Sequence, residues 1–412
     1  MKGIQIVDYI VGTKILNTYK YLLEVQYEDS KTLNMMSRRA VLDLWETAKN
    51  LPYYKDFDTV DSTPILNKGI IKNQFDKFVN SKIPESKRIT KKTGGSTGEP
   101  FIYYTGLESQ SYLWAGIMLS WNSAGWNPGD KMAFLAGSSI VGKGLKKKVF
   151  YRLMNILPFD SFDLTAARMT RLLSKLKSSK VQFMYGYANA IYHLAVFNTE
   201  YKHNVRLASV ITTAENLTEK MRDTIQRSFQ CEVFNQYGCN DAGISAFECK
   251  SHCGLHLINT RAYVEVVDDK LISTDTTNYV MPMIRYDSGD RVSFSKSSCP
   301  CGRGFPLISE VFGRSNDCVV NKRTGAYIHS EFFNHLFRED REISSFQVQI
   351  AGEAMKILFK LLPKFQTLSK ADEYLQLVKK KTGYNNVEFA CNQEFYKANN
   401  GKTPLIVNHN FK

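Results

Sequence analysis

The chain has 412 residues, of which 43% are hydrophobic and 23% are charged. These proportions are typical of a globular protein and exclude a disordered, collagen-like or disulfide-scaffold chain. At about 150 residues per domain, the length fits one large domain with a smaller one, or three equal domains. The formal net charge of +14 indicates an anionic partner such as a nucleotide, a nucleic acid, an acidic polymer or a membrane surface.

Residues 1–27 are amphipathic and interrupted by charged side chains, and no later window approaches 18 uncharged apolar residues. The pattern predicts neither a secretory signal nor a membrane span, so we expect a cytoplasmic protein. All eight cysteines lie from Cys231 onward. In a chain without an export signal, this clustering indicates metal ligands or buried thiols rather than disulfides.

The N-terminal part reads as helical and basic, and the middle of the chain alternates between strands and helices. The segment 217–229 places Leu217, Met221, Ile225 and Phe229 on one helical face. Helices are predicted over residues 37–48, 67–78, 165–176 and 217–229, and strands over 131–136, 181–185, 208–213 and 231–234. This β-α-β order predicts an α/β fold with a largely parallel sheet.

From residue 255 onward, hydrophobic and polar residues alternate between polar turns, which predicts a more antiparallel region. The composition changes again after Arg314. Strands are predicted there over residues 318–320, 346–350, 356–361 and 387–390, and helices over 330–337 and 371–381. This order indicates a separate small α+β domain.

A segment rich in glycine and hydroxyl residues is the most unusual part of the sequence. It consists of Thr93, Gly94, Gly95, Ser96, Thr97, Gly98, Glu99 and Pro100. Glycines let backbone N–H groups converge and hydroxyls add further donors, so the segment suits a phosphate chain. A solvent-exposed linker fits the same composition. A rival phosphate loop at residues 137–144 ends in glycine where Mg²⁺ binding requires a hydroxyl residue, which argues against it.

Three later segments each combine polar and glycine residues: 235–241, 285–290 and 313–317. Each alone is an ordinary turn, but their order behind the glycine-hydroxyl segment is specific. The chain resembles the adenylate-forming superfamily of acyl-CoA synthetases, peptide-synthetase adenylation domains and luciferases. Within it, the chain is most similar to the phenylacetate–CoA ligase branch and its capsular-polysaccharide relatives. The resemblance runs from residue 51 to Lys402.

The resemblance implies a two-part α/β architecture. A large N-terminal adenylation domain, residues 1–314, would have mixed sheets flanked by helices and a zinc-binding insertion at about 249–301. Residues 315–318, with Asp317, would form the hinge to a small mobile α+β domain, residues 319–412.

The resemblance also implies a role for each motif residue. Thr93, Gly94, Gly95, Ser96, Thr97 and Gly98 would close over the ATP phosphates, and Thr213, Ala214 and Glu215 would form the adenine-side loop. Gln236, Tyr237 and Gly238 would flank the adenine, with Tyr237 stacked on it. Asp241 would hold Mg²⁺, Asp290 the ribose hydroxyls and Arg314 the ribose or phosphate. Lys402 would stabilise charge on the adenylating oxygens.

Two of these motifs depart from the superfamily pattern. Glu99 stands where lysine is common, and a negative charge there weakens triphosphate binding unless it faces solvent. Asn240 and Asp241 stand where a hydroxyl residue and glutamate are usual, so the carboxylate reaches one methylene less far. Both changes predict slow or lost catalysis.

Two cysteine-containing arms predict a structural zinc site. Cys299 and Cys301 form a tight knuckle, and residues 249–256 supply the other arm. The branch pattern favours Cys249, His256, Cys299 and Cys301 as ligands, with Cys253 as the substitute for His256. Buried thiols without a metal are the alternative.

The leading hypothesis is an enzyme that adenylates a carboxylic acid with ATP and Mg²⁺, and then transfers the acyl group to CoA or an amine. The capsule-like resemblance adds an amino sugar as a candidate acceptor in surface-polysaccharide synthesis. One competitor is an adenylation fold that binds nucleotide without turnover. Another is a zinc-ribbon nucleic-acid binder; it predicts aromatic residues interleaved with a basic cluster, and only Lys146–Lys148 beside Phe150 and Tyr151 fit. We therefore expect no stable nucleic-acid partner.

Overall fold

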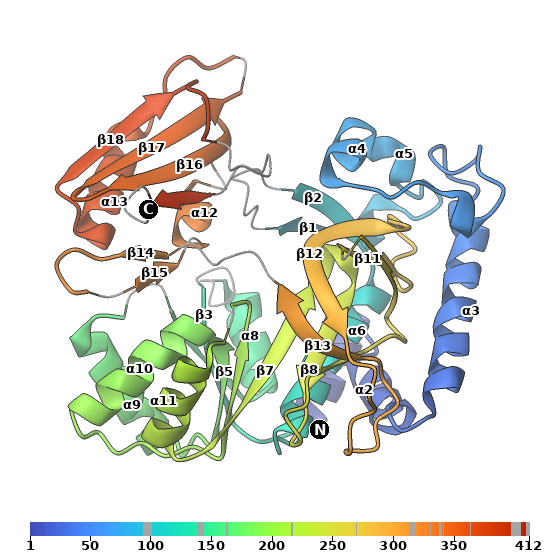
Figure 1. The fold of residues 1–412 in the computed structure, drawn as a ribbon, viewed down its shortest axis with the longest axis horizontal. Coiled ribbons are helices and arrows are strands. Elements are labelled where there is room, and N and C mark those ends of the chain that lie inside the picture. Colours follow the sequence, from blue (N-terminus) through green and yellow to red (C-terminus); the bar gives the residue numbers. More distant parts are fainter. Residues whose placement is uncertain are drawn as a thin grey trace.

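The computed structural model describes most of the chain (Figure 1). The described residues are 1–93, 101–137, 144–161, 164–215, 217–268, 270–312, 318–325, 327–329, 331–337, 340, 342–362, 364–396 and 405–408. Several predicted site residues lie outside them: Gly94, Gly95, Ser96, Thr97, Gly98, Glu99, Arg314, Asp317 and Lys402. Among the described residues, no helix combines the length and the apolar character needed to cross a membrane.

One large sheet joins the middle of the chain in the order β10-β11-β12-β13-β9-β8-β7-β6-β5-β3-β4. Its parallel half consists of β3 (Met132–Ala136), β4 (Ile156–Asp160), β5 (Phe183–Tyr187), β6 (Ser209–Thr213) and β7 (Glu232–Cys239). Its antiparallel half consists of β8 (Ile244–Glu248), β9 (Leu255–Leu257), β10 (Ala262–Val267), β11 (Lys270–Asp275), β12 (Tyr286–Phe294) and β13 (Leu307–Phe312). The predicted change of pairing after residue 255 is therefore confirmed, although the first antiparallel pair is already β7–β8.

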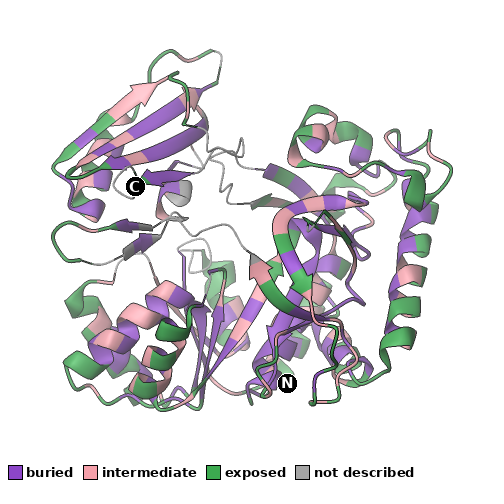
Figure 2. Ribbon diagram, viewed as in Figure 1, coloured by how far each residue is buried: buried purple, intermediate pink, exposed green. Residues whose placement is uncertain are grey.

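Helices cover the parallel half of the sheet, in which β3, β5 and β6 are buried along almost their whole length (Figure 2). They are α6 (Leu107–Ser123), α8 (Leu145–Leu153), α9 (Ala166–Ser178), α10 (Ala188–Glu200) and α11 (Glu219–Phe229). In α11, Met221, Ile225 and Phe229 are buried as the fourfold spacing predicts, and Thr218 caps the helix by accepting from the Met221 N–H. This confirms the predicted α/β layering.

The N-terminal part is helical, with one small hairpin. It contains α1 (Lys2–Val11), α2 (Ile15–Val25), α3 (Ser30–Ala48), α4 (Lys68–Asn73), α5 (Phe75–Phe78), β1 (Ile89–Thr93) and β2 (Phe101–Thr105), besides the short 3₁₀ turns Val60–Ser62 and Glu85–Lys87. A further 3₁₀ turn, Asn240–Ala242, joins β7 to β8. The helix predicted at 37–48 begins earlier because Asp29 caps α3 through the N–H groups of Lys31 and Thr32. The single helix predicted at 67–78 is wrong, since Gln74 leaves helical geometry and separates α4 from α5.

The C-terminal elements form their own sheets and their own hydrophobic core (Figure 1). They are β14 (Cys318–Val320), β15 (Tyr327–His329), α12 (Glu331–Phe337), β16 (Ile343–Ala351), β17 (Ala354–Leu361), α13 (Ala371–Thr382), β18 (Asn386–Cys391) and β19 (Ile406–Asn408). The strands β18-β17-β16-β19 form one sheet in that order, and β14 pairs with β15. The predicted α+β character of this part is confirmed, whereas the hinge stays a prediction.

Candidate nucleotide site and metal centre

Two of the predicted nucleotide-binding segments lie side by side at the carboxyl ends of parallel strands. Thr213, at the end of β6, pairs with Tyr187 on β5 and with Gln236 on β7. Residues 213–215 and 236–238 therefore lie on neighbouring strands near the same edge of the sheet. Ligands of open α/β sheets bind outside this edge, so the predicted location has the expected topology.

The segment after β6 is conformationally unusual. Ala214 has φ of 65°, a left-handed conformation that non-glycine residues rarely adopt. Glu215, which follows, is buried, and its carboxylate accepts the backbone N–H of Asn189 at 2.6 Å. A negative charge at the first turn of α10 stabilises that helix end. Glu215 thus holds the segment in place, and Ala214 stores strain of the kind that clusters at ligand sites.

Strand β7 continues beyond the predicted end at residue 234, through Cys239, because β8 returns antiparallel beside it and completes its hydrogen bonding. Tyr237 and Gly238 are therefore strand residues rather than turn residues. The turn to β8 contains Asn240, Asp241 and Gly243, the last with φ of 68°. A side chain on Gly243 would lie 2.5 Å from the Cβ of Asp275, so only glycine fits there.

Asp241 is buried and fully engaged with neighbouring groups. The Tyr286 hydroxyl donates to Oδ2 at 2.8 Å, the Cys239 thiol donates to Oδ1 at 3.1 Å, and the Lys68 Nζ lies 3.5 Å from Oδ2. Burial alone would raise the pKa of Asp241, but the charge of Lys68 and the hydrogen bonds from Cys239 and Tyr286 outweigh it and lower that pKa. Asp241 is consequently ionised at neutral pH, as a cation ligand must be.

Asp290 lies in β12, although its segment was predicted to be a turn. The strand persists because β11 and β13 flank it, while Gly289, with φ of 81°, accommodates an irregularity in the β11 pairing. The Tyr237 hydroxyl donates to Asp290 Oδ2 at 2.7 Å. Tyr286, at the start of β12, donates its hydroxyl hydrogen bond to Asp241 in the turn after β7. Because β12 and β7 are not neighbours in the sheet, these contacts require the sheet to curve. The predicted segments 235–241 and 285–290 therefore lie in contact with each other.

The sequence analysis missed Lys68, Tyr286 and Cys239 as partners of the site. Tyr286 and Cys239 lie inside motifs that were recognised, so their positions gave a signal. Lys68 has no such signal, because a lone lysine at the start of a short helix resembles a solvent-exposed residue. It is brought to the site by α4, whose first turn Asn67 caps through the Ile70 N–H.

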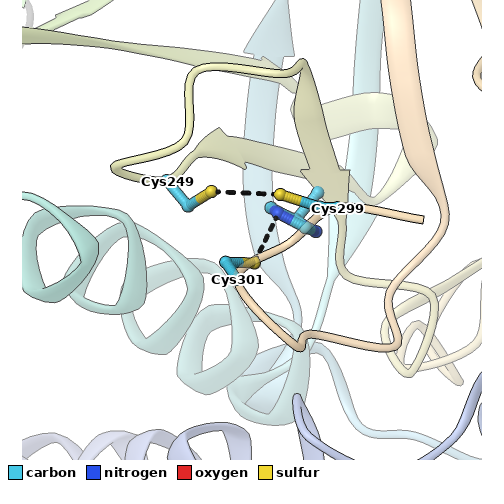
Figure 3. Close-up of side chains that lie close together, drawn as sticks. Cys249, Cys299 and Cys301 are labelled. Atoms are coloured by element: carbon cyan, nitrogen blue, oxygen red, sulfur yellow. Dashed lines mark hydrogen bonds between the residues drawn. The ribbon is translucent and has the colours of Figure 1, made fainter. Parts of the chain in front are cut away.

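The four predicted metal ligands lie together in a second cluster (Figure 3). The ligand atoms of Cys249, His256, Cys299 and Cys301 all lie within 4.8 Å of one another. The Cys249 and Cys299 sulfurs are 3.5 Å apart, and Cys301 Sγ lies 3.3 Å from His256 Nε2. Cys253 is exposed and donates to the Ser251 carbonyl at 3.2 Å instead. Of the two predicted alternatives, the structure places His256 in the cluster.

Pairing of two strands produces this cluster. Cys249 lies on the connection from β8 to β9 and His256 lies on β9, whereas Cys299 and Cys301 lie on the connection from β12 to β13. His256 on β9 pairs with Leu307 on β13, which brings the two connections together. Burial and, secondarily, the nearby Arg303 charge lower the pKa of His256 to about 4, so its ring is neutral and able to bind a metal at neutral pH.

Comparisons with known proteins agree with this geometry. No family model matches the chain. Two solved structures of 2-hydroxyisobutyryl-CoA ligase, in the postadenylation and thioesterification states, have 17% and 18% identical residues and TM-scores of 0.56 and 0.59. Each match covers 92% of this chain, and 90% and 89% of the other. The chain thus has the fold of 2-hydroxyisobutyryl-CoA ligase.

Two curated relatives narrow this placement. Protein CapK of Staphylococcus aureus is 26% identical over 65% of this chain and 61% of its own length. Phenylacetate-coenzyme A ligase of Thermus thermophilus is 23% identical over 57% of this chain and 56% of its own length. The chain therefore spans about six tenths of each relative it matches. The resemblance to the phenylacetate–CoA ligase branch and its capsular relatives is confirmed.

Proposed function

We propose that this chain is a ligase that uses ATP to adenylate a carboxylic acid, releasing pyrophosphate, and then transfers the acyl group to CoA or an amine. The observation that carries the proposal is the convergence of Asp241, Tyr237 and Asp290 beside the strained loop at Ala214. These side chains come from motifs far apart in the sequence, and a fold of CoA ligases surrounds them.

The described residues supply binding and orientation for the nucleotide. Asp290, fixed by the Tyr237 hydroxyl, is a carboxylate able to accept both ribose hydroxyls. The buried, ionised Asp241 fits a Mg²⁺ ion, which would neutralise phosphate charge; the ammonium of Lys68 must then move away or share Oδ2. In-line attack of a carboxylate on the α-phosphate needs such positioning and no protein nucleophile.

The remaining roles rest on the resemblance alone. Thr93 ends β1, and with Gly94, Gly95, Ser96, Thr97 and Gly98 it would cover the ATP phosphates. Arg314 would contact ribose or phosphate, and Lys402 would stabilise the charge that develops on the adenylating oxygens. The hinge at 315–318 would let the small domain place Lys402 at the nucleotide site during adenylation. The same hinge would let the domain move away for acyl transfer.

The second cluster fits a structural zinc ion. Tetrahedral ligands at zinc-bond lengths lie about 3.3–3.8 Å from one another, which matches the separations between Cys249 and Cys299 and between Cys301 and His256. Three thiols and one neutral imidazole are a donor set that selects zinc. We assign Cys249, His256, Cys299 and Cys301 to this ion, with no part in the reaction.

The acceptor is the least constrained part of the proposal. The neighbouring solved structures include a ligase in complex with an acyl-adenylate and CoA, which supports CoA. The relationship to CapK supports a role in capsular or exopolysaccharide biosynthesis, where an amine such as an amino sugar would accept the acyl group. Such a reaction would take place in the cytoplasm, where ATP and CoA are available.

Pyrophosphate release from ATP, measured over a panel of carboxylic acids with and without CoA, tests the proposal. Acid-dependent release is expected, with CoA accelerating turnover if it is the acceptor. Nucleotide binding without release for any acid would favour a nucleotide-binding protein without turnover, an alternative motivated by Glu99 and by the engagement of Asp241 with Lys68. Salt-dependent binding of an oligonucleotide, with no release, would favour a nucleic-acid binder.

A further inference from the structure

A fully buried arginine lies behind the nucleotide site. Arg261, just before β10, is 2% exposed. Its backbone is held on both sides: its N–H donates to the Ile258 carbonyl at 3.1 Å, and its carbonyl accepts from the N–H and hydroxyl of Thr276 at 3.0 and 2.9 Å. In its side chain, Nη1 donates to Ser245 Oγ at 2.7 Å, while Nε–H has no hydrogen-bond partner among the described residues. The guanidinium is therefore rigidly placed and incompletely satisfied.

Arg261 is hydrogen-bonded to a strand next to the proposed nucleotide site. Ser245, its partner, lies on β8 opposite Gly238 of β7, directly after the turn that carries Asp241. The buried Tyr103 on β2 lies close enough to both Asp241 and Arg261 for their charges to act on its hydroxyl. Arg261 and Asp241 therefore both lie near Tyr103.

A second cation, the ammonium of Lys91, lies near the Arg261 guanidinium. Lys91 on β1 pairs directly with Tyr103, so the two side chains project from the same face of the hairpin. The Lys91 ammonium donates to Gln110 Oε1 on α6 at 2.8 Å. Burial lowers the pKa of Lys91, and the charges of Arg261 and Lys147 lower it further. Two cations are therefore held near each other in a weakly solvated place, an arrangement that an anion would relieve.

The carboxylate of Asp275 is near Arg261 and acts on it electrostatically, but no hydrogen bond or direct ion pair joins the two among the described residues. Instead, Asp275 Oδ1 accepts from the N–H and hydroxyl of Thr277 at 3.0 and 2.6 Å. The guanidinium thus retains donors for another group.

We infer that Arg261, with Lys91, forms a subsite for a second carboxylate on the acid, so that the substrate is a dicarboxylic acid activated at one end. This inference rests on the proposed ligase function. One carboxylate would lie at the α-phosphate beside Asp241, and the other would accept from the Arg261 guanidinium, whose planar donors match carboxylate geometry. A site with buried donors also rejects analogues that lack the acceptor, because those donors are then left unpaired.

Paired substrates of equal chain length test the inference in the full chain: succinate against butyrate, and glutarate against pentanoate. Pyrophosphate release should favour each dicarboxylate by at least about tenfold in kcat/KM. Arg261→Gln should reduce that ratio by about tenfold to a hundredfold, mainly through KM, and Arg261→Lys should retain part of it. Arg39→Gln, at an exposed arginine on α3, is the matched control and should keep the wild-type ratio.

Calorimetry of succinate and butyrate binding to the wild type and to Arg261→Gln gives a second measurement that does not need turnover. Tighter binding of succinate, lost in Arg261→Gln, supports the inference. Equal use and equal binding of the paired acids by the wild type would overturn it, even if the Arg261 variants do not fold. An Arg261→Gln protein that loses ATP affinity but keeps acid selectivity would assign the cations to the ATP phosphates instead. No pyrophosphate release with any acid would refute the ligase function, while the binding data would still decide the subsite.

Discussion

The site around Asp241 and the cysteine cluster both adjoin strands β8 and β12, but their side chains interact in different ways. Around Asp241, unlike groups satisfy one another: an acid, an ammonium, a hydroxyl and a thiol. In the other cluster, like groups face one another, and thiols are weak hydrogen-bonding partners that stabilise each other little. The first site is complete without a ligand and suits reversible binding. The second would gain its stability from the zinc ion proposed for it.

The metal cluster should give the largest effect if this contrast is right. We expect about one zinc per chain, and Cys299→Ser with Cys301→Ser should lose it and lower the free energy of unfolding by on the order of 5 kcal/mol, because structural zinc contributes its binding energy to folding. Metal analysis and chemical unfolding measure both quantities. Cys253→Ser, at an exposed thiol outside the cluster, is the control; full zinc content and stability in the double variant would break the comparison.

On the nucleotide side, Lys402→Ala should slow adenylation by about 10²–10³-fold, because it removes a cation from the transition state. Pyrophosphate release measures this step. Folding should be preserved, as should acyl transfer from a supplied acyl-adenylate, which would use the other orientation of the small domain. Lys380→Ala, at an exposed lysine of α13, should behave as wild type. Wild-type pyrophosphate release by the Lys402 variant would remove Lys402 from the mechanism.

Asp290→Asn should weaken nucleotide binding by about 1.5–3 kcal/mol, since a neutral amide is a weaker acceptor for ribose hydroxyls and for Tyr237. Calorimetric titration with ATP or a non-reactive acyl-adenylate analogue measures the change. The exposed Asp56→Asn variant controls for loss of charge alone. Unchanged affinity in a folded Asp290→Asn protein would show that β12 does not contact the nucleotide.

The smallest expected effect concerns Lys68 and pH. Because the pKa of Asp241 is lowered in the folded protein, its ionisation stabilises the fold above the unfolded pKa of about 3.9, and this contribution is lost as pH falls through the folded pKa. Lys68→Met should raise the pKa of Asp241 and cost about 1 kcal/mol at pH 7, with less difference from wild type at pH 3. Urea unfolding at both pH values tests this, with the exposed Lys82→Met as control. A difference that does not change with pH would assign Lys68 a packing role only.

Residue spacing within a single segment predicted those features that depend on neighbouring residues in the sequence. The fourfold spacing in α11 and the cysteine arms were visible in the sequence, because one helix face or one ligand set explains each. The extension of β7 was not visible, since its hydrogen-bonding partner β8 lies later in the chain. The pairing of β1 with β2 was hidden by the basic composition of residues 91–92.

The same distinction applies to the site. Asp241 and Asp290 could be predicted because each lies in a motif, yet their contacts with Lys68 and Tyr237 depend on how the sheet curves. Arg261 could not be predicted, because a single arginine before a strand is most often exposed. Its burial depends on elements distant in the sequence, such as α6, which packs against β8, the strand that carries its partner Ser245.

The strand connections that meet at the thiol cluster also have a consequence for the protein's sensitivity to oxidation. The strand β8 runs from the turn containing Asp241 to Cys249, and β12 runs from Tyr286 through Asp290 toward Cys299. With zinc bound as proposed, one ion would hold together the segments that follow β8 and β12, the two strands adjoining or carrying Asp241 and Asp290. Oxidation of these thiols, or chelation of the ion, would therefore disturb Asp241 and Asp290 from a distance and weaken the proposed ATP binding, which would make that binding sensitive to zinc supply and to oxidation.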